Sequence, residues 1–308
     1  MSFTGTGKIW MNGKLIPSVE AKTHILTHGL HYGSSVFEGE RAYGGKIFKS
    51  KEHTERFRKS AQIMDFDLPF SDAEINAAID ADPSLRNLVA AYNGLVSPIA
   101  NAVIGSTTAT LARSADAAGN TPAGELIADS QLAATAPANF GAATIAFMNP
   151  GGVRADFTFA GSAAGEGDGN ITYGEAFTVQ PFGNSLVTMT LTQQDIKNLL
   201  EQQFAGCRGQ TANRVMLPSA GFKYGFDATK ACDARITNVS LGDEILVNAA
   251  GILTDPLKPY RVTVNNFMST GGDGFTTLLG GTNLLGGAQD IDALVAYLAD
   301  FPASDPYD

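Results

Sequence analysis

Three glycine-rich loops with aromatic or charged side chains are the feature that most constrains the fold of this chain. They are residues 149–154, 179–184 and 266–275. Each follows an apolar stretch that favours a strand, and glycine lets the backbone approach a ligand closely. We therefore expect strands to deliver the three loops to one shared cleft.

The side chains in these loops suggest what the cleft would bind. Phe182 and Phe267 each offer a flat apolar face, and Arg154 offers a planar cation. A flat ring with an anionic or hydroxylated tail would complement this set of side chains. The pattern therefore predicts a small-molecule pocket.

Charge and histidine content change abruptly near residue 80. Residues 1–80 hold ten Lys/Arg, ten Asp/Glu and all the histidines, whereas residues 81–308 hold eleven Lys/Arg, twenty-one Asp/Glu and no histidine. The histidines are His24, His28, His31 and His53. Such a shift predicts two domains, 1–80 and 81–308.

The net charge of −10 restricts the partners of the chain. Nucleic-acid polymers and anionic membranes both require a basic face, so we expect neither as a partner. A small anionic ligand remains compatible, because distant surface charge is screened over about 10 Å. No apolar run is long enough to span a membrane, and the N-terminus lacks a signal-peptide pattern. The sequence as written fits a cytoplasmic chain, and the location of the protein stays open.

Local patterns predict a mixture of helices and strands. An Asn-Gly turn predicts a hairpin over residues 8–17, and a second strand pair is expected around residues 43–46. Ser71 and Glu74 form a capping-box pattern, and Pro98 is expected to end a helix. Further helices are expected from Thr121, from Thr192 to Phe204 and over 291–298, with strands over 145–148, 187–191 and 260–264. The predicted class is α+β.

Two cysteines, Cys207 and Cys232, lie in the acidic part of the chain. The sequence leaves two interpretations open: two free thiols, or a disulfide that closes a loop. Two cysteines alone do not make a typical structural zinc site, and no histidine lies nearby to complete one.

Residues 8–78 resemble the start of branched-chain aminotransferases, the fold-type IV enzymes that use pyridoxal phosphate. The resemblance rests on residues 9–13, 24–33, 34–39, Arg41 and the helix from Glu52 to Arg56. It implies that Arg56 corresponds to the arginine that holds the cofactor phosphate. It also implies that Tyr32, Phe37 and Gly39 shape the pocket for the substrate side chain.

The chemistry of that family needs groups that this sequence does not match. Pyridoxal phosphate forms a Schiff base with a lysine, and its pyridine nitrogen needs a carboxylate. None of the four lysines after residue 80 lies in a matching context, so the sequence predicts no transamination and no cofactor. For His24, His28 and His31 ordinary packing is the preferred interpretation, with a metal-binding helical face as the alternative.

Residues 82–308 resemble the C-terminal, substrate-specificity domain of the 5'-nucleotidases. The matching motifs occur in order over residues 124–129, 149–154, 171–174, 179–184, 219–224 and 260–275. The resemblance implies that Phe182 and Phe267 sandwich a nucleobase and that Arg154 reaches the phosphate or sugar. It further implies hydrogen bonds to base or ribose from Asn149, Asn184 and Asp273, with Gly221 allowing close approach. Glu125 departs from the neutral polar residue common in the family.

Hydrolysis in the 5'-nucleotidases requires a two-metal centre that the resemblance places in a preceding domain. Because no histidine follows residue 53, we expect no catalytic residues and no metal ligands in this chain. The sequence therefore predicts a mixed α/β specificity domain that follows an incomplete α+β aminotransferase segment and binds a nucleotide or nucleoside without its own turnover. The alternatives are an aminotransferase, or a natural or engineered fusion without a ligand. A homodimer through residues 1–80 is a further expectation.

Overall fold

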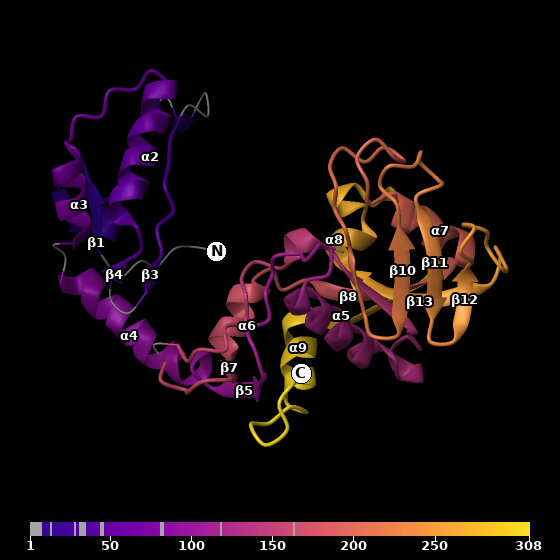
Figure 1. The fold of residues 1–308 in the computed structure, drawn as a ribbon. Helices are drawn as coiled ribbons and strands as arrows, with labels where there is room; N and C mark the ends of the chain where they lie inside the picture. Colours follow the sequence, from indigo (N-terminus) through magenta and orange to yellow (C-terminus); the bar gives the residue numbers. More distant parts are fainter. Residues whose placement is uncertain are drawn as a thin grey trace. The chain divides into compact units, whose positions relative to one another are not determined.

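The computed structural model describes residues 8–12, 14–27, 29–30, 35–43, 46–80, 83–117, 119–162 and 164–308. The chain divides into two compact units, Met1–Ser97 and Pro98–Asp308 (Figure 1). Each unit contains both helices and strands, which agrees with the predicted α+β class. The predicted change of family near residue 80 lies within the first unit and stays a prediction.

In the residues that the structure describes, the first unit contains two short hairpins, one short 3₁₀ helix and three longer helices. The elements are β1 (Lys8–Met11), β2 (Lys14–Pro17), η1 (Ser18–Glu20), β3 (Ala42–Tyr43), β4 (Lys46–Ile47), α2 (Ser50–Ile63), α3 (Asp72–Asp80) and α4 (Pro83–Ala100), which runs on into the second unit. Antiparallel pairing of β1 with β2 confirms the predicted hairpin, and Asn12 at its turn has a φ of 51°. Gly13, His28, His31 and Tyr32 lie outside the described residues.

Two helix ends in this unit test local sequence rules. The Ser71 backbone N–H and hydroxyl donate to Glu74 Oε2, and the Glu74 N–H donates to the Ser71 hydroxyl, which confirms the capping box at the start of α3. The predicted end at Pro98 was wrong, because α4 continues through it to Ala100. Pro98 lacks the N–H that would donate to the Gly94 carbonyl, so α4 loses one hydrogen bond there and ends two residues later.

The described side chains of the first unit bury very little apolar surface. Among its described side chains only Thr54 and Ala61 are buried. Ile25, Leu30 and Phe37 are exposed, Phe37 by 86%. The described aliphatic and aromatic side chains of this unit are therefore largely accessible to solvent.

The second unit contains a five-stranded sheet, a three-stranded sheet and a two-stranded ladder. The strands are β5 (Val103–Ser106), β6 (Ile145–Met148), β7 (Asn170–Thr172), β8 (Ser185–Thr192), β9 (Leu217–Pro218), β10 (Phe222–Phe226), β11 (Ile236–Leu241), β12 (Glu244–Val247), β13 (Pro259–Asn265) and β14 (Thr282–Gln289). The helices are α5 (Pro122–Thr135), η2 (Ala138–Phe140), η3 (Pro150–Gly152), α6 (Tyr173–Val179), α7 (Gln193–Glu201), α8 (Asn266–Ser269), η4 (Gly272–Gly274), η5 (Thr276–Gly280) and α9 (Asp290–Leu298).

The five-stranded sheet has the order β14-β8-β13-β6-β9 and carries a core on each face. On one face Ile145 and Phe147 pack with residues of α7 and of the sheet β10-β11-β12. On the other face Met148 packs with residues of α5 and α9. The alternation along β6 follows the two-residue period of a strand, and all four of its residues are buried.

In the second unit, the predicted helix starts agree with the structure better than the predicted helix end does. Thr192 and Asp195 form a reciprocal capping box at the start of α7, as predicted. The helix ends at Glu201, three residues before the predicted end at Phe204. Thr121 occupies the N-cap of α5, but its hydroxyl makes no capping hydrogen bond.

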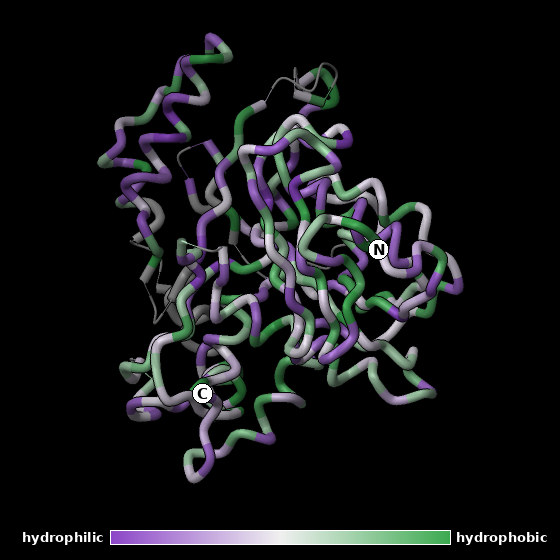
Figure 2. The backbone as a smooth tube through the Cα atoms, turned by 45° about the vertical axis from the view of Figure 1, so that its right-hand side comes forward, coloured by the Kyte–Doolittle hydropathy of each residue, from purple (hydrophilic) through white to green (hydrophobic). Residues whose placement is uncertain are grey.

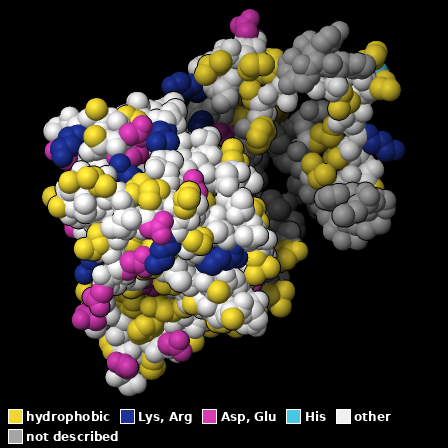
Figure 3. Space-filling view, turned by 90° about the vertical axis from the view of Figure 1, so that its right-hand side faces the viewer, with side chains coloured by type: hydrophobic (Ala, Val, Ile, Leu, Met, Phe, Trp, Pro, Cys, Tyr) yellow, Lys and Arg dark blue, Asp and Glu magenta, His cyan; other side chains and the backbone are white. Residues whose placement is uncertain are grey.

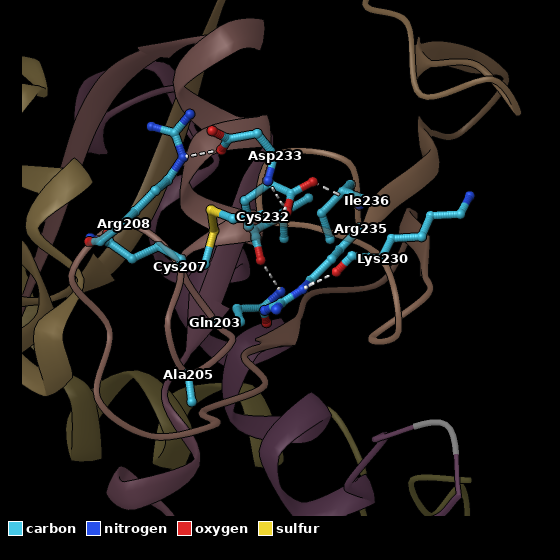
Figure 4. The surroundings of a disulfide bond; sticks show 12 residues. Gln203, Ala205, Cys207, Arg208, Lys230, Cys232, Asp233, Arg235 and Ile236 are labelled. Atoms are coloured by element: carbon cyan, nitrogen blue, oxygen red, sulfur yellow. Dashed lines mark hydrogen bonds and ion pairs between the residues drawn. A yellow bond between two sulfur atoms is a disulfide. The ribbon is translucent and has the colours of Figure 1, made fainter.

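A disulfide joins Cys207 to Cys232, which decides between the two interpretations of these cysteines. Their Cα atoms are 5.2 Å apart, within the usual range for a disulfide. Figure 4 shows that the neighbours of the two cysteines, Arg208 and Asp233, face each other, with a nitrogen–oxygen distance of 2.7 Å. The bond ties the loop after α7 to the loop between β10 and β11.

On the face drawn in Figure 3, basic and acidic side chains are interspersed, without one large basic field. Hydrophobic and hydrophilic stretches alternate along the backbone (Figure 2), and no helix in the described part of the chain is long and apolar enough to cross a membrane.

Candidate functional site

Two of the three predicted loops leave the sheet at the same end. Strands β6 and β13 are parallel, with Val262 opposite Ile145. Asn149 directly follows β6, and Asn265 is the last residue of β13. Since the carboxyl ends of neighbouring parallel strands lie at one edge, the pairing brings the two asparagines together.

The third loop reaches the same end from the opposite direction. Residues 180–184 follow the helix α6 and precede β8, so the expectation of a strand before this loop was wrong. Strand β8 is antiparallel to β13, with Leu186 opposite Asn265. Asn184 therefore lies at the carboxyl end of β13. A hydrogen bond of 2.8 Å from the Arg154 N–H to the Val179 carbonyl ties the first loop to the start of this segment.

These loops enclose a cavity of about 350 Å³. Six of the seven predicted substrate-binding residues line it, together with two glycines and a third asparagine. The lining is Asn149, Gly151, Gly152, Arg154, Phe182, Asn184, Asn265, Phe267 and Asp273. The structure thus brings together side chains that lie up to 124 residues apart in the sequence, while the role of each stays a prediction.

Gly221 is the predicted residue that does not line this cavity. It follows β9, which is antiparallel to β6 with Leu217 opposite Met148. The chain therefore runs from the cavity end of β6 back towards its amino-terminal end. Gly221 lies there, in a turn beside a separate cavity.

Three polar side chains form a hydrogen-bonded chain along one wall of the cavity. The Asn265 amide donates to Asn149 Oδ1 at 3.0 Å, and the Asn149 amide donates to Asp273 Oδ2 at 2.7 Å. Asn265 Oδ1 also accepts the N–H of Met268 and caps α8. Because Asn149 and Asn265 are buried, these bonds fix their orientation.

The aromatic residues of the site are partly exposed. Phe182 is 54% exposed and Phe267 is 47% exposed, although both rings line the cavity. The guanidinium of Arg154 lies over the Phe182 ring, 5.8 Å from the ring centroid, and donates to the Gly151 carbonyl at 3.1 Å. A planar ligand that covered both rings would bury apolar surface that water now contacts.

Asn184 is held by hydrogen bonds to the buried residue Asp290. Its side-chain amide donates to Asp290 Oδ2 at 3.2 Å, and its carbonyl accepts the Asp290 N–H at 2.8 Å. Burial raises the pKa of Asp290, against the lowering effect of these hydrogen bonds. The contact fixes Asn184 at the amino end of α9, where the buried carboxyl group also accepts the N–H of Ile291.

The separate cavity beside Gly221 is larger, about 490 Å³, and contains two carboxyl groups. Desolvation raises the pKa of Glu125, with a further contribution from Asp129. Desolvation also raises the pKa of Asp129, although its carboxylate accepts the Ala220 N–H at 2.5 Å. Glu125, the residue that departs from the family pattern, therefore lies outside the aromatic cavity.

Asn265 is the lining side chain that the sequence reasoning missed. The sequence pattern predicts a strand that ends at residue 264 and a loop that starts at Asn266. The available signal was an asparagine directly after an alternating apolar strand, since such residues commonly cap helices or end strands.

In the first unit, Arg56 is already engaged by a carboxylate. Arg56 Nε donates to Glu38 Oε1 at 2.6 Å, and Nη2 lies close to Oε2; His53 contacts Oε2 at 2.8 Å. The hydrogen bonds from Arg56 and then from His53 lower the pKa of Glu38 to about 2. A pyridoxal phosphate group at Arg56 would face this ionised carboxylate, so the arrangement does not fit the cofactor phosphate.

The other described residues implied by the aminotransferase resemblance are accessible to solvent. Phe37 and Gly39 are exposed, and His24 accepts the Leu26 N–H through Nδ1 at 3.1 Å. The described residues also offer no matching set of ligands for the metal ions implied by the nucleotidase resemblance. Among the described residues, the one group of three candidate ligands is Cys207, Cys232 and Asp233, and its two sulfurs are joined to each other.

Comparison with known protein families shows which family the larger unit resembles. The family described as "5'-nucleotidase, C-terminal domain" matches residues 103–280, more than half of the chain. The chain belongs to the 5'-nucleotidase C-terminal domain family. A second family, amino-transferase class IV, matches residues 35–136, so the two matched ranges share residues 103–136.

Individual relatives support both assignments. The 5'-nucleotidase precursor of Thermus thermophilus is 30% identical in sequence with a TM-score of 0.54, over 70% of this chain and 40% of that one. A probable branched-chain-amino-acid aminotransferase of Rickettsia felis is 51% identical over 84 residues, which are 27% of this chain and 29% of the relative. Endonuclease YhcR of Bacillus subtilis is 28% identical over 248 residues, 79% of this chain and 17% of that protein. The chain thus spans less than half of each of these relatives.

These matches confirm both resemblances inferred from the sequence. The 5'-nucleotidase C-terminal domain is a substrate-binding domain of nucleotidase type, and in this chain it carries the cavity that the three loops enclose. The aminotransferase likeness belongs to the N-terminal part.

Proposed function

We propose that the second unit binds a nucleotide or nucleoside in the cavity between residues 149–154, 180–184 and 265–273. The observation that carries the proposal is the convergence of two half-exposed phenylalanines, one arginine and one aspartate on the same space. A volume of about 350 Å³ lies at the lower end of the range for small-molecule pockets.

Each part of a nucleotide has a chemical counterpart in this cavity. The rings of Phe182 and Phe267 offer stacking surfaces for a base, although the spacing of about 7 Å required for a sandwich stays a prediction. Arg154 offers a cation for a phosphate, and Asp273 offers carboxylate oxygens that accept hydrogen bonds from hydroxyl groups. An acceptor and a cation at one site favour a ligand that carries both hydroxyl and anionic groups.

Titration calorimetry of the whole chain with AMP and adenosine tests this proposal. We expect saturable binding of both ligands at one site. Arg154→Met should weaken AMP binding by about ten-fold and adenosine binding much less, because only AMP carries the phosphate. Arg235→Met removes a guanidinium that lies over the Phe204 ring instead and serves as the control. Absence of saturable binding by the wild-type chain would overturn the proposal.

We further propose that this chain alone does not hydrolyse the bound nucleotide. The support is its sequence, which holds no histidine after residue 53, whereas the centre implied by the resemblance uses histidine, aspartate and asparagine ligands. Purified chain with AMP and added Mn²⁺, Co²⁺ or Zn²⁺ should release no phosphate above buffer. Phosphate release that persists through purification and stops with EDTA would contradict this expectation.

A homodimer through the N-terminal segment is a second proposal. It is supported by the exposed side chains of Ile25, Leu30 and Phe37, since exposed apolar surface favours association. Sedimentation velocity over a concentration series should show a dimer that Phe37→Ser weakens. A monomer at all concentrations would exclude it.

A further inference from the structure

Two side chains that are not part of the cavity lining contact Asp273. Arg214 Nε lies 3.2 Å from Asp273 Oδ1, and Arg214 Nη1 donates to Gln210 Oε1 at 3.0 Å. Gln210 Nε2 in turn donates to the Asp273 carbonyl at 3.0 Å. Neither Gln210 nor Arg214 belongs to the cavity lining, so both act on a ligand only through Asp273.

The backbone of Asp273 has a conformation that is uncommon for residues other than glycine, asparagine and aspartate. Its φ of 56° and ψ of 15° place it in the left-handed region, between Gly272 and Gly274. Gln210 is buried and packs directly against Gly274, where an added Cβ would lie 2.9 Å from Gln210 Oε1. The backbone and the carboxylate of Asp273 are therefore both tied to the segment that carries Gln210 and Arg214.

The segment that carries Gln210 and Arg214 is held in place by hydrogen bonds and by the disulfide. Gln210 exchanges two backbone hydrogen bonds with the turn that contains Cys207: its N–H donates to the Cys207 carbonyl, and its carbonyl accepts the Gly206 N–H, both at 2.9 Å. Cys207 is joined to Cys232 (Figure 4). Gln202 adds a further tie, since its amide donates to the Arg208 carbonyl and its Oε1 accepts the N–H of Thr277.

The Asp273 carboxylate keeps acceptor capacity after these contacts. Oδ1 is used by Arg214 and Oδ2 by Asn149, and each carboxylate oxygen can accept about two hydrogen bonds. Adjacent hydroxyl groups, such as those of a ribose, match two oxygens held at a fixed angle. A carboxylate that could rotate would lose this match.

We propose that Gln210 and Arg214 are positioning residues that orient Asp273 to accept the two ribose hydroxyls, so that the site selects ribonucleosides and ribonucleotides over their dideoxy forms. The proposal rests on nucleoside binding in this cavity. It assigns the selectivity for the sugar to a pair of side chains that never touches the ligand.

Calorimetric titration with adenosine and with 2',3'-dideoxyadenosine tests the proposal on the whole chain. Wild-type protein should bind adenosine at least about ten-fold more tightly, because hydrogen bonds to a charged acceptor are strong. Arg214→Met should reduce adenosine affinity by about ten-fold and change the affinity for the dideoxy form by less than about two-fold. Arg214→Lys keeps the charge but cannot bridge Asp273 and Gln210 in the same way, so its loss for adenosine should be intermediate.

Arg208→Met is the matched control. Arg208 lies in the same segment, is about one-third exposed like Arg214, and pairs through Nε with Asp233 instead of Asp273. We expect wild-type affinity for both ligands from this variant. Circular dichroism establishes that each variant is folded, and Arg214→Lys carries the test if Arg214→Met is not.

The outcomes separate this inference from the proposed function. Failure of the wild-type chain to bind either nucleoside would overturn both. Binding of both nucleosides with equal affinity would leave nucleoside binding intact and overturn the inference. Equal losses for the two ligands in Arg214→Met, or no loss at all, would also overturn it, because a purely structural role does not distinguish the sugars.

Discussion

The unit with the higher sequence identity to a relative is the one whose described side chains bury less apolar surface. The first unit contains the stretch that is 51% identical to an aminotransferase over 84 residues, yet Thr54 and Ala61 are its only buried residues among the described side chains. The second unit matches a nucleotidase at 30% identity and carries an apolar core on each face of its sheet. Sequence identity thus reports ancestry and local structure, whereas a core depends on how many elements pack together.

The largest expected effect is a contrast between two phenylalanines, one from each unit. Phe147→Ala should reduce the free energy of unfolding by about 3–5 kcal/mol, because Phe147 is fully buried between the sheet and its neighbours. At a protein concentration low enough for the chain to be monomeric, Phe37→Ala should change it by less than about 0.5 kcal/mol, since that ring is 86% exposed. Urea denaturation followed by circular dichroism measures both.

Similar losses of unfolding free energy for the two variants would contradict this expectation. They would mean that Phe37 finds a partner in solution, and repeating the measurement at several protein concentrations would identify a second copy as that partner.

Removing the disulfide is the next test and should affect the second unit alone. Cys207 and Cys232 are 25 residues apart, so the double change to serine should cost about 3 kcal/mol if the chain-entropy account holds. Hydrogen exchange measured by mass spectrometry should show faster exchange over residues 202–236 and unchanged exchange over residues 50–80. Unchanged exchange in both regions would show that the non-covalent contacts of the loop suffice.

Phe267→Ala should separate binding from stability within the second unit. Loss of one stacked face should weaken AMP binding by about ten-fold. The loss of stability should stay below the 3–5 kcal/mol typical of a core phenylalanine, because the ring is already 47% exposed. Phe177→Ala, which removes a ring that is 46% exposed and lies outside the cavity lining, is the control for both measurements. The reverse pattern, unchanged binding with a large loss of stability, would place Phe267 in the core.

The smallest expected effect is the pH response of the first unit. The hydrogen bonds from Arg56 and His53 lower the pKa of Glu38 from 4.5 to about 2. Its ionised form therefore stabilises the fold above pH 4.5, and this contribution is lost as the pH falls from 4.5 through 2. The difference in thermal stability between wild type and Glu38→Gln should shrink between about pH 6 and pH 3. A constant difference would show that the contact with Arg56 contributes little in water.

The parts of the fold that were predicted from sequence depend on neighbouring residues. The capping boxes of Ser71 with Glu74 and of Thr192 with Asp195 each close within three residues, so the pattern contains both partners. The buried strand at 145–148 was visible as an apolar run. The end of α4 was not, because Pro98 comes so late in the helix that it no longer terminates it.

In the site, too, residues within one short segment were predictable, whereas contacts between distant segments were not. Loop chemistry pointed to Arg154, Phe182 and Phe267 as pocket residues. The resemblance to the 5'-nucleotidases implied three more residues that line the cavity, Asn149, Asn184 and Asp273. The place of Gly221 was not predictable from the loops, since it depends on the antiparallel pairing of β9 with β6. Likewise no local pattern relates Gln210 to Asp273, which is 63 residues away.

The Gly-Asp-Gly triplet at 272–274 also limits which substitutions this cavity can accept during evolution. A side chain at Gly272 would overlap the backbone and ring of Phe267, and one at Gly274 would press on Gln210. Asp273 itself has a left-handed backbone that few residues other than Asn and Asp tolerate. Exchange to Asn would keep the loop and replace one acceptor oxygen by a donor. The most accessible single-residue route to a new ligand preference is therefore a change of hydrogen-bond polarity, with the shape of the cavity retained.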